Sequence, residues 1–150
     1  MTSTLTNPTA LSTAAASVAI SDRAVARAVD LAVVGAPAVG LVALFGPVGV
    51  LLGLALMYVY ESLAVAITGT TLGKRLKSLR VVDVDTGDKP MPAKAGSRVL
   101  VVVALAAVAQ IVAGIGPMVA VFVWGSAAAT MDRRGLADRM ARTAVVPAAP

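Results

Sequence analysis

Three ionisable residues border a long uncharged part of this chain, and their types could carry a proton or a cation. Arg27 and Asp30 precede, and Glu61 follows, the thirty consecutive uncharged residues 31–60. If the chain reverses near Gly46, Asp30 lies sixteen residues before the turn and Glu61 lies fifteen after it. At about 1.5 Å of rise per helical residue, the two carboxylates then reach nearly equal depth. Because Arg27 is three residues before Asp30, it shares a helical face with it. We therefore expect the three side chains to form one cluster.

This cluster supports two hypotheses. Two carboxylates beside one guanidinium are not expected to stay ionised together, so Asp30 and Glu61 could exchange a proton or a monovalent cation while Arg27 holds the resting pair. Alternatively, the three side chains form a clamp that holds two helices together, because an arginine near a helix end can pair without any transport role.

The composition and the uncharged runs predict an all-α membrane protein. Of its 150 residues 58% are hydrophobic and 14% are charged, and the mean hydropathy is +0.87. A monomeric water-soluble domain could not cover that much apolar surface. At about 20 residues per crossing, residues 31–60 hold two membrane helices. A second uncharged run, 99–131, holds either two helices broken at 114–117 or one long helix. We expect a bundle of four transmembrane helices, with three as the alternative, at about residues 22–45, 47–67, 92–113 and 118–131.

The polar segments are expected on the cytoplasmic side. All thirteen lysines and arginines fall within residues 1–27, 68–98 and 131–150. The positive-inside bias therefore predicts a multi-pass protein of the cell membrane with both termini in the cytoplasm. Residues 1–21 are rich in Ser, Thr and Ala and are predicted as a disordered tail, residues 22–146 as the membrane domain and residues 147–150 as a second tail.

The cytoplasmic loop 68–91 is expected to be ordered. Three leucines at helical spacing predict a short amphipathic helix on the membrane surface: Leu72, Leu76 and Leu79. Three bases on its other faces are expected to contact anionic lipid headgroups: Lys74, Arg75 and Lys77. Residues 80–84 and 143–146 favour extended structure and are expected to pair as a small cytoplasmic β-ribbon. Arg98 and Asp138 would then lie near the same membrane interface and could pair.

Missing residue types narrow the chemistry. The chain has neither cysteine nor histidine, so thiolate chemistry, histidine bases and the common zinc sites are excluded. We expect no enzyme, no cofactor and no metal site. Residues 69–75 resemble a P-loop but have three residues rather than four between the glycines. Because only 3% of residues are aromatic, nucleic acid is not an expected partner, whereas anionic membrane lipid and further copies of the chain are.

Several motifs resemble those of the RDD family of bacterial membrane proteins. They are Arg27-Ala-Val-Asp30, Tyr60-Glu61, Gly69-Thr-Thr-Leu-Gly-Lys-Arg75, Arg98 and Arg134-Gly-Leu-Ala-Asp138. The resemblance covers about residues 23–146 and implies a multi-pass membrane domain. It places the arginine and two aspartates that give the family its name at Arg27, Asp30 and Asp138.

Two functions therefore stand as expectations. Oligomers of this small bundle could transport a small ligand, a proton or a monovalent cation, as the resemblance also implies. The alternative is a structural or assembly protein that organises lipid or a partner protein without transport.

Overall fold

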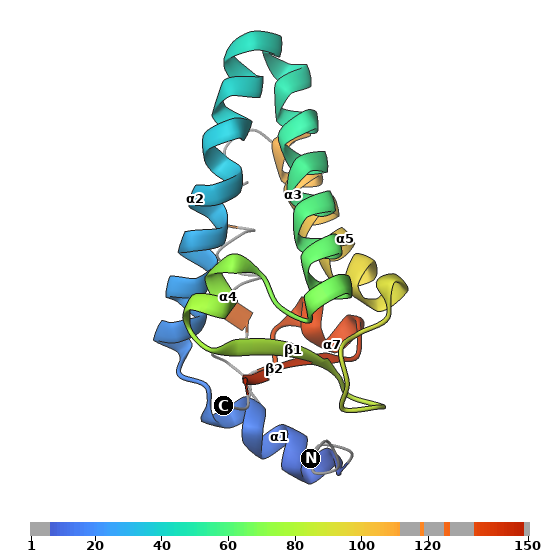
Figure 1. The fold of residues 1–150 in the computed structure, drawn as a ribbon. Helices are drawn as coiled ribbons and strands as arrows, with labels where there is room; N and C mark the ends of the chain where they lie inside the picture. The colour runs from blue at the N-terminus through green and yellow to red at the C-terminus, as the bar shows by residue number, and fades with distance from the viewer. Residues whose placement is uncertain (1–6, 112–117, 119–124, 127–133, 149–150) are drawn as a thin grey trace.

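A computed structural model describes residues 7–111, 118, 125–126 and 134–148 (Figure 1). This part is mostly helical and contains one two-stranded sheet. In chain order the elements are α1 (Pro8–Ser17), α2 (Ile20–Phe45), α3 (Pro47–Thr68), α4 (Leu72–Leu76), β1 (Leu79–Asp83), α5 (Pro92–Ile111), α7 (Leu136–Met140) and β2 (Thr143–Pro147). Most of the predicted helix 118–131, and the end of the one predicted over 92–113, lie outside the described residues.

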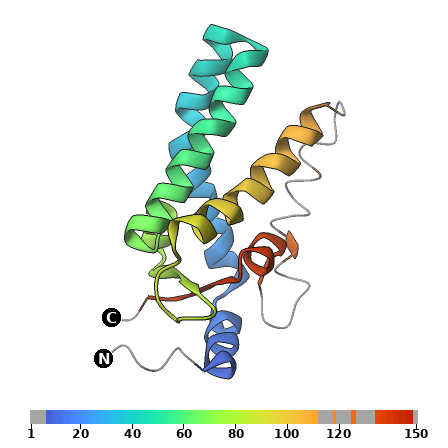
Figure 2. The same ribbon diagram turned by 90° about the vertical axis from the view of Figure 1, so that its right-hand side faces the viewer.

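A long hairpin of α2 and α3 extends away from the rest of the fold (Figures 1 and 2). Its turn is Gly46, whose φ of 56° favours glycine, and Pro47 begins α3, where a missing N–H is tolerated. Both helices are long and apolar enough to cross a membrane. Only 11% and 17% of their most apolar 18-residue windows are buried in the fold. Most side chains in these windows are therefore not buried within the fold, as expected of helices surrounded by lipid.

Two glycines bring α2 and α3 together near the turn. An added Cβ at Gly49 would lie 2.1 Å from the Leu41 carbonyl oxygen, and one at Gly53 would lie 3.0 Å from Ala38 Cβ. Small residues four apart on α3 thus let the backbone of α2 approach closely.

The two β segments pair at the base of the hairpin, as the sequence predicts. Strands β1 and β2 are antiparallel, with Val81 opposite Val145. One face of the sheet packs against the ends of the helices through Leu79, Val81 and Val145. The opposite face carries Val82 and contacts α1. The sheet therefore joins the base of the hairpin to both ends of the described chain.

Helix α1 differs from the disordered tail expected over residues 1–21. Its first turn is capped by the Asn7 side chain, which accepts a hydrogen bond from the Thr9 amide at 3.0 Å. Leu11 and Ala15 are buried against the sheet beside Val82. Order over residues 8–17 thus comes from a tertiary contact with β1 and β2, which lie far along the chain.

Helix α5 packs against α3 near its start and leans away from the hairpin farther along (Figure 2). Near its start, Lys94 lies 2.7 Å from both Asp83 Oδ2 and Asp85 Oδ2. The hydrogen bond from Lys94 holds the pKa of Asp85 below its usual value. These ion pairs connect the start of α5 to the last residue of β1 and to the turn that follows it.

Candidate functional site

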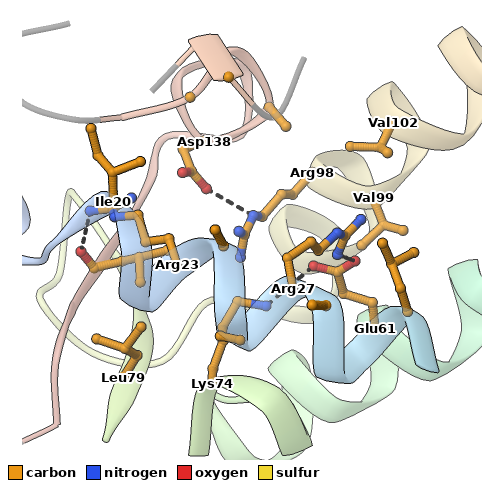
Figure 3. Close-up of a pocket in the computed structure, with 18 residues that line it drawn as sticks. Ile20, Arg23, Arg27, Glu61, Lys74, Leu79, Arg98, Val99, Val102 and Asp138 are labelled. Atoms are coloured by element: carbon orange, nitrogen blue, oxygen red, sulfur yellow. Dashed lines mark hydrogen bonds and ion pairs between the residues drawn. The ribbon is translucent and has the colours of Figure 1, made fainter. Parts of the chain in front are cut away.

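The predicted residues Arg27 and Glu61 meet at the base of the hairpin, where Lys74 joins them (Figure 3). Arg27 Nη1 lies 2.5 Å from Glu61 Oε2, and Lys74 Nζ lies 3.4 Å from Glu61 Oε1. All three side chains are largely buried, with at most 16% of each exposed. One carboxylate therefore connects α2, α3 and α4.

The third predicted residue, Asp30, lies beside the Arg27–Glu61 ion pair and is surrounded by hydrogen-bond donors. Its Oδ1 accepts hydrogen bonds from the Tyr60 hydroxyl at 3.0 Å and the Gly73 amide at 2.8 Å. Its Oδ2 accepts a hydrogen bond from the Thr71 hydroxyl at 2.6 Å, and Lys74 Nζ lies 3.8 Å away. The two carboxylates are thus neighbours, and Lys74 contacts both.

The loop that resembles a P-loop holds a carboxylate of the protein itself. Thr71 caps α4 through its side chain, and the same hydroxyl donates to Asp30. Gly73 fits tightly against α2, because an added Cβ would lie 1.9 Å from the Ala26 carbonyl oxygen. The glycine thus allows the backbone of α4 to reach Asp30.

The prediction that Lys74 contacts lipid headgroups is wrong. The residue is 7% exposed and faces Asp30 and Glu61, because the close contact at Gly73 turns this side of α4 inward. Burial lowers the pKa of the Lys74 ammonium, and the Glu61 carboxylate opposes that shift. Arg75 remains exposed.

Tyr60 and Thr71 are site residues that the charge pattern did not reveal. Neither carries a formal charge, and both act as hydroxyl donors to Asp30. Only their positions in the sequence could have indicated them, since Tyr60 directly precedes Glu61 and Thr71 directly precedes the Leu72-Gly73-Lys74 segment.

A second ion pair lies across the base from the first. Arg98 Nε of α5 lies 2.8 Å from Asp138 Oδ1 of α7, with side chains 12% and 8% exposed. The Thr143 hydroxyl lies 3.5 Å from the same Asp138 oxygen. The sequence analysis expected Arg98 and Asp138 to pair, and the pair connects α5 to the C-terminal segment.

A cavity of about 450 Å³ lies between these two ion pairs (Figure 3). Most of its wall is apolar, and includes Leu31, Val99 and Val102. Among the described residues, its charged lining consists of four bases and two acids: Arg23, Arg27, Lys74, Arg98, Glu61 and Asp138. Arg23 donates hydrogen bonds to the Ala15 and Val145 carbonyl oxygens. The cavity therefore combines an apolar wall with an excess of positive charge.

The charged groups at the base of the hairpin form ion pairs and hydrogen bonds with one another. The Asp30 and Glu61 carboxylates already accept hydrogen bonds from, or form ion pairs with, other groups of the protein. Within the described ranges, no group of three or more Asp or Glu side chains could hold a metal ion. An added cation would meet four bases at the cavity wall, whereas an added anion would be attracted.

Comparison with known protein families gives a match. The model of the RDD family matches residues 18–142, from the residues just before α2 to the residue before β2. No curated protein matches the chain, and no solved structure matches it.

Proposed function

Because this chain belongs to the RDD family of membrane proteins, we propose that it is a multi-pass protein of the cell membrane with a structural or assembly role. In that role it organises anionic lipid or a partner protein at the cytoplasmic face, without moving cations and without catalysis. The observation that supports this role is the buried ion cluster of Arg27, Glu61 and Lys74. It fastens three elements together with groups that already have partners.

The proposed orientation follows from where the charges lie. The turn of the hairpin at Gly46 carries no charge. The described lysines and arginines belong to the opposite end, together with the sheet and α1 (Figure 1). The positive-inside bias therefore favours the cytoplasm for this end, and for both termini.

Cysteine labelling tests this orientation, and the natural chain helps because it contains no cysteine. We expect Thr9→Cys and Asp88→Cys, both at exposed positions, to react with a membrane-impermeant maleimide only after cells are opened. Phe45→Cys, beside the hairpin turn and 53% exposed, is expected to react in intact cells. Labelling of positions 9 and 45 from the same side would contradict the membrane-spanning hairpin.

The surface of α4 supports contact with lipid. Leu72 and Leu76 lie one helical turn apart and are 51% and 73% exposed, with exposed Arg75 between them. Lys77, half-buried and 3.1 Å from Asp22, lies at the end of this helix. Exposed leucines beside a base suit the boundary between acyl chains and anionic headgroups.

Cation or proton transport through an oligomer is the second candidate. The observation that favours it is the presence of two buried carboxylates, Asp30 and Glu61, with one lysine between them. The donors around both carboxylates and the surplus of bases weigh against cation exchange, because a mobile cation would have to displace or face fixed positive groups.

Ion flux in liposomes separates the two candidates. For purified protein in liposomes, we expect proton, sodium and potassium flux no greater than in protein-free liposomes. Flux in the natural protein that is lost in Asp30→Asn, in a variant that still inserts, would overturn the structural proposal. An Asp22→Asn protein, altered at a half-buried acid outside the cluster, is the matched control.

A further inference from the structure

We propose that the cavity beside Arg98 binds the phosphate group of an anionic phospholipid, with its glycerol and first acyl carbons against the apolar wall. This inference deepens the proposed function and rests on the membrane placement given there. It concerns the region between the two ion pairs, where α2, α5 and α7 meet (Figure 3).

The charge of the cavity favours an anion. The four bases and two acids that line it in the described part of the chain leave an excess of two positive charges. Counting Asp30, which Lys74 also contacts, still leaves one. In surroundings of low polarity this excess attracts an anion more strongly than it would at an exposed surface. A zwitterionic headgroup is a poorer match, because its own cation would face the same bases.

Arg98 supplies a specific donor. Its Nε is paired with Asp138, whereas its Nη1 is buried and no atom among the described residues accepts a hydrogen bond from it. Buried donors usually have partners, and leaving one without a partner is unfavourable. A guanidinium matches phosphate oxygens in charge and geometry. Because Arg98 lines the cavity, a phosphate oxygen there would complete its hydrogen bonding once the guanidinium turns Nη1 toward the cavity.

The wall identifies the rest of the ligand. Leu31, Val99 and Val102 line the cavity beside the bases, so a free hydrated anion would leave this surface without a partner. The volume of about 450 Å³ falls within the range of small-molecule sites, about 300–1,000 Å³. It suits a headgroup with the adjoining carbons, while the acyl chains remain in the bilayer along the apolar helices.

The test titrates purified protein in detergent with dioleoyl phosphatidylglycerol and follows the midpoint of thermal unfolding. We expect a saturable rise with phosphatidylglycerol, and neither phosphatidylcholine nor inorganic phosphate should reproduce it. In the double variant Arg98→Gln and Asp138→Asn, the guanidinium is lost without a change of net charge. We expect its apparent affinity to be lower by at least about tenfold, because a charge-assisted hydrogen bond is removed.

Two further variants distinguish loss of lipid binding from loss of folding. Val102→Phe keeps every charge and fills the cavity, so it is expected to lose the response while still unfolding cooperatively. Lys89→Gln removes one exposed base outside the cavity and should keep the response of the natural protein. An equal response to phosphatidylcholine, or an unchanged response in Val102→Phe, would overturn the site. A rise with inorganic phosphate alone would overturn the lipid as ligand.

Failure of this proposal differs from failure of the proposed function. If cysteine labelling supports the orientation but the titration shows no lipid selectivity, only the cavity site is lost. If labelling places positions 9 and 45 on one side, the membrane placement falls whatever the titration shows.

Discussion

Gly73→Ala is expected to abolish stable accumulation of the protein in the membrane. The added Cβ would lie 1.9 Å from the Ala26 carbonyl oxygen and 3.0 Å from Asp30 Cγ. The first of these is a backbone atom of α2, which cannot rotate away as a side chain could. Forcing α4 outward would break the Gly73 hydrogen bond to Asp30 and move Lys74 away from both carboxylates. Overpacking costs about 1–3 kcal/mol, occasionally more, and the loss of the cluster adds to that cost.

The measurement is the amount of membrane-inserted protein together with its elution as a single species from size-exclusion chromatography in detergent. Gly40→Ala is the matched control, because an added Cβ there meets nothing within 4 Å. It is expected to accumulate like the natural protein. Normal accumulation of Gly73→Ala would show that α4 does not pack against α2 as described.

Glu61→Gln is expected to destabilise the protein by about 3–5 kcal/mol, because it leaves two buried cations without their shared counter-charge. Arg27 and Lys74 lie on either side of this carboxylate, and without it their positive charges face each other in a buried site. Glutamine keeps the shape of the side chain, so the loss reports charge rather than packing. Reversible unfolding in detergent micelles measures the change in the free energy of unfolding.

A second substitution shows whether the effect belongs to the pair. Lys74→Met in the Glu61→Gln background removes one of the uncompensated charges, so the double variant should lose less stability than the two single losses added together. Asp22→Asn is the control, since the Asp22–Lys77 pair is 44% and 35% exposed. It should change stability by no more than about 1 kcal/mol. Equal losses for Glu61→Gln and Asp22→Asn would argue against a buried ion cluster.

The hairpin could be predicted closely because its signals are local. Uncharged residues between Asp30 and Glu61, with Gly46 at the turn and Pro47 after it, set the limits of two helices. The observed helices, Ile20–Phe45 and Pro47–Thr68, end within two residues of the expected bounds. The equal depth of the two carboxylates follows from the same counting along a helix.

The site was only partly predictable, because its remaining members are placed by contacts between elements. Lys74 lies in a segment whose leucine spacing suggests a helix on the membrane surface, and that pattern does not show which side of α4 packs against α2. The Gly73 contact with Ala26 decides this. Tyr60 and Thr71 joined the site for the same reason, since their hydroxyls reach Asp30 only once α3 and α4 are in place.

The sequence by itself determined that the chain carries two long apolar helices joined by a short turn, with charges at the far end and a pair of β segments there. These properties depend on the order and polarity of neighbouring residues, which any fold of the chain must respect. Only the tertiary structure decided that Lys74 points inward, that residues 8–17 form a helix against the sheet, and that Arg98 borders a basic cavity. These features arise where surfaces distant in sequence meet, and their stability depends on close fit and on charges removed from water.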